Sequence, residues 1–313
     1  MDVIVFGSLN MDLVAQVTRL PLPGETISGQ SFATVPGGKG ANQAVAAARQ
    51  GASTVMVGRV GADGFGEVLR DHLQSEKIDV EAIALSDAPS GTALIAVAPA
   101  NNQIIVVPGA NGEVKDSDLE RLTPYFAEAK VLLLQFEIPL PVVQKAAMLA
   151  HQAGLTVIVD PAPAQGPLTA EFCQHISILT PNQTEAATLT GQDVGDVEGA
   201  IAAAQILQRQ GVEVVIIKLG ALGCVCATEE GVFTVPAFSV QAVDTVAAGD
   251  AFNGGLAAAL CRQSRESRGK QHPLKLAVRS ASAVAALAVT QAGSQEAMPT
   301  KTDVETFLQK HHF

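Results

Sequence analysis

Short apolar runs alternate with amphipathic segments along most of the chain. Apolar residues recur with helical spacing in Leu140 to His151 and in Ala200 to Gln210. The apolar runs around these helices lie at Val3 to Phe6, Val131 to Phe136, Thr156 to Val159, Ile176 to Leu179 and Val214 to Ile217. Buried strands that alternate with helices are typical of a parallel sheet with helices on both faces. The pattern therefore predicts an α/β fold with a doubly wound, mostly parallel sheet.

Two stretches interrupt this alternation. Residues 13–36 lack helical periodicity and contain the turn-forming pair Pro23-Gly24. In the second stretch, Leu94 to Val97 and Ile104 to Val107 flank Asn101-Asn102, which indicates a β-hairpin. We expect residues 13–36 and 91–108 to form a small β-sheet lid. The remaining α/β domain would comprise residues 1–12, 37–90 and 109–313.

A turn of small residues lies between a predicted strand at Phe238 to Val240 and a predicted helix at Ala251 to Leu260. The backbone N–H groups of such a turn can converge on an anion at the helix start, where the helix dipole favours negative charge. The small residues are Ala247, Ala248 and Gly249. Asp250 follows them and can accept a proton from a hydroxyl group. A base beside an anion hole favours phosphoryl transfer to an alcohol, and a simple helix cap by Asp250 is the alternative.

Polar side chains also follow the first predicted strand. Asn10 and Asp12 are two residues apart, so their side chains face the same side of an extended chain. One amide and one carboxylate can hold adjacent hydroxyl groups, which suits a polyol ligand. An Asx turn after the strand is the alternative interpretation.

A glycine-rich segment, Gly37-Gly38-Lys39-Gly40-Ala41-Asn42-Gln43-Ala44, opens a predicted helix that continues to Arg49. Consecutive glycines let the backbone approach a ligand closely, and Lys39 and Asn42 project from the loop and the first helical turn. A glycine-rich helix start without a ligand is the alternative. The chain has no G-x-x-x-x-G-K-[ST] motif, and no G-x-G-x-x-G follows the first strand. A P-loop ATPase and a dinucleotide-binding fold are therefore disfavoured.

Polar or glycine-rich groups recur where the later strands end. In a parallel sheet these ends gather at one edge, where ligands commonly bind. We therefore expect one edge to collect Asn10, Asp12, Glu137, Asn182, Glu185, Gly220 and Asp250.

Composition limits the classes of partner. The 313 residues are 48% hydrophobic, with 28 Gly and 16 Pro, which is ordinary for a globular α/β protein. The formal net charge of −11 disfavours nucleic acid or an anionic membrane as the main partner. The N-terminus is too short and too acidic for a signal peptide, and no run approaches the roughly 20 apolar residues of a membrane span. We expect a soluble cytoplasmic protein.

Neither the cysteines nor the basic run near the C-terminus indicates a second kind of site. The four cysteines show no paired metal-ligand spacing and are interpreted as reduced packing residues: Cys173, Cys224, Cys226 and Cys261. The basic run from Arg262 to Lys275 contains no aromatic residue and is interpreted as a solvated helix end and loop.

Three motifs resemble the ribokinase-like (PfkB) carbohydrate kinase family. They are the glycine-rich segment 37–44, Asn182-Gln183-Thr184-Glu185, and Asp244-Thr245-Val246-Ala247-Ala248-Gly249-Asp250. They occur in the family order, and the similarity spans essentially the whole chain. The third motif ends in Ala-Ala-Gly-Asp, where many relatives have Gly-Ala-Gly-Asp. The resemblance implies the family fold and an ATP-dependent kinase activity.

The resemblance also implies a role for each matching residue. Asp250 would take the proton from the sugar hydroxyl, and the amides of residues 247–250 would stabilise charge on the γ-phosphoryl group. The family's sugar contacts match Asn10, Asp12, Gly38, Lys39, Gly40, Asn42, Glu137 and Asp250. Its ATP contacts match Asn182, Lys218, Leu219, Gly220, Ala221, Leu222, Gly223, Gly249 and Ser282. Glu185 would help to organise Mg²⁺ and phosphate through water.

A site for K⁺ beside the anion hole is a further implication of the resemblance. The matching groups are Asp244 and the carbonyl oxygens of Val246, Ala288, Gln291 and Gly293. Ala297 stands where relatives often have Ser, so this chain lacks one hydroxyl group beside the cation.

The implied function is phosphorylation of D-ribose at O5, with ATP, Mg²⁺ and K⁺. The exposed edges of the lid also predict a homodimer that pairs two lids across a two-fold axis. A kinase for deoxyribose, another sugar or a nucleoside is the nearest alternative. A sugar-binding regulator without catalysis would have no need of the intact Gly249-Asp250, and a dehydrogenase would show its glycine motif.

Overall fold

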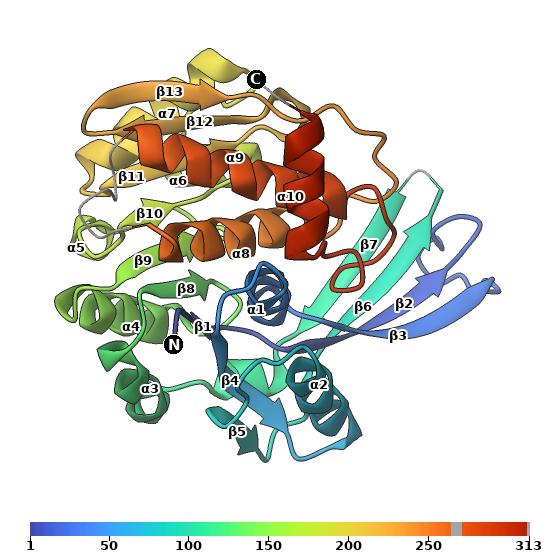
Figure 1. Cartoon of the computed structure of the whole chain (residues 1–313). Coiled ribbons are helices and arrows are strands. Elements are labelled where there is room, and N and C mark those ends of the chain that lie inside the picture. Colours follow the sequence, from blue (N-terminus) through green and yellow to red (C-terminus); the bar gives the residue numbers. More distant parts are fainter. Residues whose placement is uncertain (100, 264–270, 312–313) are drawn as a thin grey trace.

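The computed structural model describes residues 1–99, 101–263 and 271–311. In these residues a large sheet has nine strands in the order β13-β12-β11-β10-β9-β8-β1-β4-β5 (Figure 1). Their bounds are β1 (Val3–Phe6), β4 (Thr54–Gly61), β5 (Ile83–Ser86), β8 (Val131–Gln135), β9 (Thr156–Asp160), β10 (Ile178–Leu179), β11 (Val214–Lys218), β12 (Cys224–Thr228) and β13 (Gly231–Val235). In this order every neighbouring pair between β11 and β5 is parallel, and β12 and β13 extend the sheet antiparallel beyond β11. The predicted mostly parallel sheet is confirmed.

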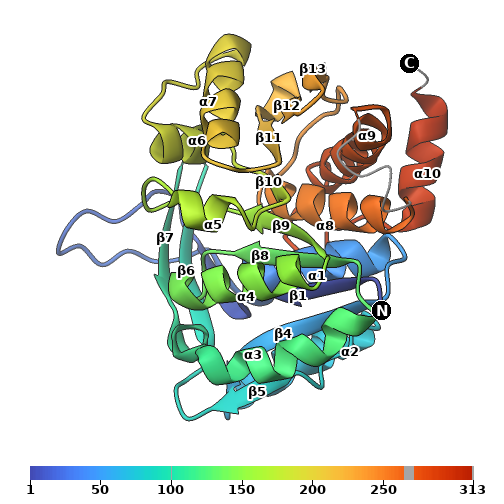
Figure 2. The same cartoon turned by 90° about the vertical axis from the view of Figure 1, so that its left-hand side faces the viewer.

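Helices cover both faces of this sheet, so two hydrophobic cores form. One face carries α1 (Lys39–Arg49), α2 (Gly64–Ser75), α8 (Ala248–Cys261), α9 (Gln271–Ala288) and α10 (Lys301–Lys310). The other face carries α3 (Asp116–Leu122), α4 (Leu140–Gln152), α5 (Ala170–Cys173), α6 (Gln183–Thr190) and α7 (Val197–Arg209). Figure 2 shows α5, α6 and α7 on one side and α9 and α10 on the other.

Strand β1 shows why the apolar runs in the sequence are unbroken. Val3 and Val5 belong to the core beneath α1 and α8, whereas Ile4 and Phe6 belong to the core on the opposite face. Successive side chains of a strand point to opposite faces, so a doubly covered strand must be apolar at every position. The predicted helices on both faces are therefore confirmed.

A second sheet of four strands, in the order β3-β2-β6-β7, extends away from the large sheet beside α1 (Figure 1). Its strands are β2 (Asn10–Gln16), β3 (Ser31–Gly37), β6 (Gly91–Ala98) and β7 (Asn101–Val107). This sheet begins at Asn10 rather than at residue 13, because β2 follows β1 after only three residues. Asn10 and Asp12 consequently lie where the small sheet joins the α/β body.

Three boundaries differ from the sequence prediction. No strand forms at Phe238 to Val240 in the described chain; Phe238 instead packs against Phe307 of α10, with ring centroids 5.1 Å apart. Phe238 is therefore buried against a helix and not in a strand of the sheet. Asn101 and Asn102 lie inside β7, paired with Ala98 and Val97, so the hairpin connection is shorter than predicted. The third difference is β10, which contains only Ile178–Leu179.

The remaining sequence expectations concern packing and the chain's surroundings. All four cysteines are free and buried, as predicted. Residues 264–270 of the basic run lie outside the described residues. No helix within residues 1–99, 101–263 or 271–311 combines the length and apolar character that a membrane crossing requires. Short 3-10 helices also lie at Gly109–Glu113, Thr123–Ala127 and Gly220–Leu222.

Candidate active site

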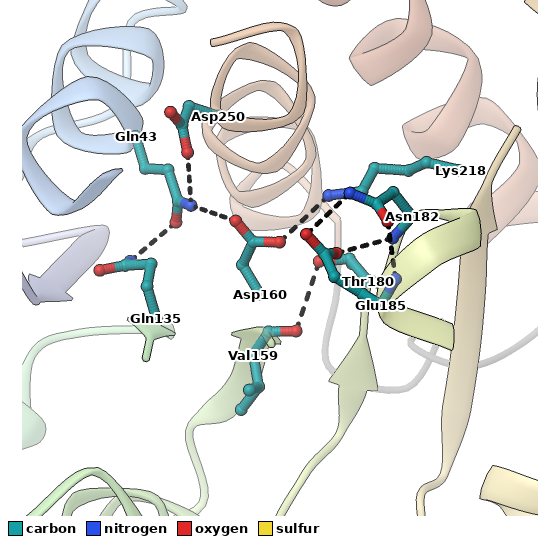
Figure 3. Close-up of polar contacts among 9 residues, drawn as sticks. All are labelled: Gln43, Gln135, Val159, Asp160, Thr180, Asn182, Glu185, Lys218 and Asp250. Carbon is teal, nitrogen blue, oxygen red and sulfur yellow. Dashed lines mark hydrogen bonds and ion pairs between the residues drawn. The ribbon is translucent and has the colours of Figure 1, made fainter. Parts of the chain in front are cut away.

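Polar side chains meet at the carboxyl edge of the large sheet (Figure 3). Gln135, Asp160 and Lys218 are the last residues of β8, β9 and β11. Asn182 follows β10 and caps α6, and Asp250 reaches the group from the first turn of α8. The edge predicted from the strand ends is therefore built from several strands and two helix N-termini.

Asp250 directly follows a turn with unusual backbone geometry. Ala247 starts α8 with φ 57° and ψ 13°, in the left-handed region that non-glycine residues rarely adopt. Because Ala247 carries no polar atom, its side chain cannot cap the first turn of α8. The Ala248 N–H donates to the Thr245 carbonyl at 3.4 Å, whereas the N–H groups of Gly249 and Asp250 have no acceptor among the described residues and stay available to an anion. The Asp250 carboxylate is buried, and its two oxygens accept hydrogen bonds from Asn42 Nδ2 and Gln43 Nε2, each at 3.0 Å. Asp250 is therefore held by α1 and is not the cap of its own helix.

A cavity of about 780 Å³ opens beside Asp250. A volume of this order accommodates a nucleotide-sized ligand. Most of the residues predicted to contact ATP line it: Asn182, Glu185, Lys218, Gly220, Ala221, Gly223, Gly249 and Ser282. Lys39, Asp160 and Asp250 line it as well, while Phe238 and Val240 supply apolar surface. The cavity thus joins an apolar wall to a cluster of charged groups.

A second polar cluster lies outside that cavity and contains most of the predicted sugar contacts; Lys39 and Asp250 also line the cavity. Glu137 Oε2 accepts hydrogen bonds from Ser8 Oγ at 2.6 Å and from the Lys39 backbone N–H at 3.1 Å. Asn10 Oδ1 accepts from Asn111 Nδ2 at 2.8 Å. Gly38 has φ 90°, and a Cβ there would lie 2.7 Å from the Asn10 nitrogen, so this turn requires glycine. Asn42 links this cluster to Asp250, because its backbone N–H donates to the Gly38 carbonyl at 2.8 Å and its Nδ2 donates to Asp250.

The chain matches the model of the pfkB family of carbohydrate kinases over residues 1–301. It belongs to this family. The ribokinase of Haemophilus influenzae is 39% identical over 307 residues, which cover 97% of each chain. Mouse ribokinase is 38% identical over 310 residues, which cover 98% of this chain and 94% of the mouse protein.

Solved structures of pfkB-family kinases share the fold. The ribokinase of Thermotoga maritima superposes with a TM-score of 0.87 at 36% identity and covers 98% of this chain and 99% of its own. The ribokinase of Arabidopsis thaliana, solved in complex with ribose and ATP, gives a TM-score of 0.87 at 32% identity, with 98% of each chain covered. The ribokinase-like fold predicted from the motifs is confirmed.

The charges in this pfkB-family site are strongly coupled. Burial opposes the charged form of Lys39, but the carboxylates of Asp250, Asp160, Glu137 and Glu185 outweigh it and raise the pKa of the ammonium group. Burial also raises the pKa of Asp250; the positive charge of Lys39 and the hydrogen bonds from Asn42 and Gln43 oppose that rise. Lys39 therefore supplies the local positive potential that a phosphorylated ligand needs in an acidic protein.

Asp12 is a further carboxylate whose ionisation the site changes. Burial, reinforced by the charges of Glu137, Asp250 and Glu296, raises the pKa of Asp12 to about 7. Its carboxylate also fills the space beside Gly37, where a Cβ would overlap it. Asp12 consequently changes charge near neutral pH.

The predicted ATP contacts do not all reach the cavity by their side chains. Leu219 is buried in the core, at 3% exposure, and Leu222 is 58% exposed to solvent. Neither residue lines the cavity. Their backbone N–H groups are used within the turn, where Leu219 donates to the Gly223 carbonyl at 2.8 Å and Leu222 donates to the Leu219 carbonyl at 3.2 Å.

The residues predicted for a monovalent cation form one loop region. The Asp244 carboxylate accepts hydrogen bonds from the backbone N–H groups of Val246 at 3.0 Å and Gly293 at 3.2 Å, and so ties the two segments together. The Ala288 carbonyl accepts from the Gln291 N–H at 3.3 Å. Ala297 is buried in the same segment, where its side chain adds no oxygen.

Several polar residues of the site carry no signal that the sequence analysis used. Ser8 and Asn111 orient the predicted sugar contacts, and Gln295 donates to Asn42 Oδ1 at 2.9 Å. Gln43 and Gln135 join Asp250 to the strand ends. Gln43 could have been noticed because it follows Asn42 in the glycine-rich motif. The other four are separated from every motif or show no distinctive spacing.

Proposed function

We propose that this chain transfers the γ-phosphoryl group of ATP to O5 of D-ribose, giving D-ribose 5-phosphate and ADP. The observation that carries the proposal is the place of Asp250, a buried carboxylate between a nucleotide-sized cavity and the polar cluster of Asn10, Asp12 and Glu137. Similarity to ribokinases of several organisms, one of them solved with ribose and ATP, supports this pair of substrates. Phosphoryl transfer requires in-line positioning and charge stabilisation more than covalent chemistry from the protein.

Each side of the site has a distinct task in this proposal. Asn10, Asp12 and Glu137 hold the sugar hydroxyls, and Asp250 accepts the proton of the O5 hydroxyl. The free N–H groups at the start of α8, together with Lys39 and Lys218, stabilise the charge that develops on the transferred group. Mg²⁺ bound with ATP would neutralise phosphate charge. Glu185, whose carboxylate accepts from Asn182 at 2.7 and 2.8 Å, is placed to hold water around that ion.

Substrate choice is tested by a panel of acceptors assayed with ATP and Mg²⁺. D-ribose, 2-deoxy-D-ribose, D-fructose and adenosine are compared by kcat/KM, and phosphorus NMR locates the phosphate on the product. We expect the highest kcat/KM for D-ribose, with phosphate on O5. A higher kcat/KM for another acceptor would reassign the substrate. If no acceptor gave ADP, the proposed kinase activity would be contradicted.

We expect activity to depend on K⁺ held by the loop that Asp244 ties together. A cation bound to the carbonyls of Val246, Ala288, Gln291 and Gly293 would align the peptide dipoles of the turn and strengthen the anion hole. The carbonyl-rich donor set suits a hard cation better than a transition metal. Asp244→Asn should then weaken cation activation and lower kcat, with little change in the sugar KM.

The measurement is a titration of KCl, NaCl and choline chloride at constant ionic strength. Activation by KCl above NaCl, reduced in Asp244→Asn, is the expected result. Equal kcat in all three salts would mean that protein contacts alone organise the loop.

We also expect the protein to be a homodimer that pairs through the small sheet. Strand β7 is an edge strand, and all its residues are exposed, including Ile104 at 53% and Ile105 at 62%. An exposed apolar edge of this kind is a liability in a monomer. Ile105→Lys should therefore halve the mass measured by light scattering at micromolar concentration.

Leu276→Lys is the matched control, since Leu276 is an apolar residue of α9 that is 52% exposed. This variant should keep the dimer mass. A monomeric wild-type protein would exclude the dimer.

A further inference from the structure

Gln43 lies between the two sides of the active site. It belongs to the first turns of α1, and its side chain is fully buried, at 0% exposure. Its Nε2 donates one hydrogen bond to Asp160 Oδ2 at 2.9 Å and one to Asp250 Oδ1 at 3.0 Å (Figure 3). Both hydrogens of the amide nitrogen are thereby used, each by a different carboxylate.

Gln135 determines which way the Gln43 amide faces. Gln135 Nε2 donates to Gln43 Oε1 at 2.8 Å. If the Gln43 amide were rotated by half a turn, its oxygen would lie between two carboxylates and its nitrogen would face a donor. Repulsion at both ends excludes that arrangement. The amide is therefore locked with its nitrogen toward Asp160 and Asp250.

Asp160 connects this amide to the cation on the phosphate side. Asp160 Oδ1 accepts from Lys218 Nζ at 3.1 Å, and the side chains are 2% and 15% exposed. A Cβ on Gly249 would lie 3.2 Å from Lys218 Nζ, so the ammonium group lies beside the turn that begins α8. A buried ion pair with these additional hydrogen bonds has a fixed geometry.

We propose that Gln43 is a positioning residue for phosphoryl transfer, which holds the base Asp250 and the Asp160–Lys218 pair in one arrangement. The inference rests on the proposed function, because it assumes that Asp250 faces the sugar and that the Asp160–Lys218 pair faces ATP. Gln43 itself contacts neither substrate, since it is fully buried and does not line the cavity. Its effect reaches the reaction through the carboxylates it holds, and small displacements of reacting groups cost large factors in rate.

Loss of the Gln43 donor also changes the ionisation of Asp250. Burial raises the pKa of Asp250, Lys39 lowers it, Asp160 raises it, and the Asn42 and Gln43 hydrogen bonds lower it. The other charged groups near Asp250 are Asp12 of β2 and Lys218 of β11, which is paired with Asp160. Without the Gln43 donor the pKa of Asp250 must rise further. The acidic limb of the kcat profile then moves to higher pH.

The test compares Gln43→Met with Gln50→Met. Methionine fills a similar volume without hydrogen-bond donors, so the first variant removes the link and limits the cavity. Gln50 is the matched control, because it is a buried Gln at the end of the same helix. Among the described residues its Nε2 donates to the Pro299 carbonyl, at 2.8 Å, and to no carboxylate. We expect kcat of Gln43→Met to fall by about 10- to 100-fold. Its acidic limb should move to higher pH, and both KM values should change by less than about 3-fold.

The control should keep kcat within about 2-fold and the wild-type pH profile. Asp160→Asn completes a double-mutant cycle with Gln43→Met. If the two residues act through one link, the double variant should lose less kcat than the product of the two single fold-losses. An unchanged pH profile in Gln43→Met, or multiplicative losses in the cycle, would overturn the inference. If Gln43→Met does not fold, Gln43→Leu takes its place, because leucine is also close in volume and has no hydrogen-bond donor: the same shift of the acidic limb supports the inference, and a wild-type profile contradicts it. A wild-type protein that phosphorylates no sugar would instead overturn the proposed function.

Discussion

Replacing Asp250 with Asn should lower kcat by about 100-fold or more, while ribose should still bind. The amide keeps the shape of the carboxylate and one acceptor oxygen, so the contact with Asn42 can persist. It cannot accept the proton of the attacking hydroxyl, however, and the N–H groups of the turn and Lys39 stabilise charge without removing that proton. The rate and the binding affinity are therefore expected to separate in this variant.

Single-turnover kinetics measure the rate of transfer, and calorimetry measures ribose binding. Asp196→Asn is the matched control, because Asp196 caps α7 by accepting from the Gly199 N–H at 2.8 Å and Asn is an equally good cap. That variant should retain kcat within about 2-fold. An Asp250→Asn protein with half the wild-type kcat would remove Asp250 from the mechanism.

The fold was predictable because its main determinants are local. Every position of β1 is apolar, and this pattern is sufficient to indicate a strand covered on both faces. The segment around Phe238 shows the limit of the same reasoning. Its apolar residues pack against α10, a partner about 70 positions later in the chain, and periodicity alone cannot distinguish that contact from strand pairing.

The candidate site was predictable where a motif contains the ligand-facing residues themselves. Asn42, Lys39 and Asp250 all lie in such motifs. Gln135 and Asn111 do not, because their roles depend on which strands and turns become neighbours in space: Asn111 meets Leu9 and Asn10 about 100 positions away. The αL conformation of Ala247 was likewise invisible, since an alanine in the sequence gives no sign of a positive φ.

Asp12→Asn is expected to weaken sugar binding and to stabilise the sugar-free protein at alkaline pH. A charged carboxylate contributes about 1.5–3 kcal/mol per hydrogen bond to a hydroxyl, so the sugar KM should rise by about 10- to 150-fold. The ATP KM should change little, because Asp12 does not line the nucleotide cavity. Because protonation removes the negative charge of Asp12, the wild-type sugar KM should rise as pH falls through the Asp12 pKa of about 7. This variant should lose that dependence.

The negative charge of Asp12 favours sugar binding but destabilises the sugar-free folded protein. The folded-state pKa of Asp12, about 7, lies above its usual value of 3.8, so the folded protein binds this proton more tightly than the unfolded chain does. Stability from this group is thus complete below the usual pKa and is lost as pH rises toward 7. Above that pH the wild-type protein keeps a carboxylate near Glu137, Asp250 and Glu296, whereas Asn has no charge to repel them.

Thermal unfolding of the sugar-free proteins at pH 5 and pH 8 measures the difference. Asp12→Asn should unfold at a higher temperature than wild type at pH 8, and the gap should narrow at pH 5. Glu25→Gln controls for net charge, because Glu25 is an acid near the small sheet that pairs only with Arg19 and the Leu22 N–H in the described contacts. A lower melting temperature for Asp12→Asn at pH 8 would mean that Asp12 makes a stabilising contact in the free protein. That result would contradict the expectation that the Asp12 carboxylate is repelled by its acidic neighbours in the sugar-free protein.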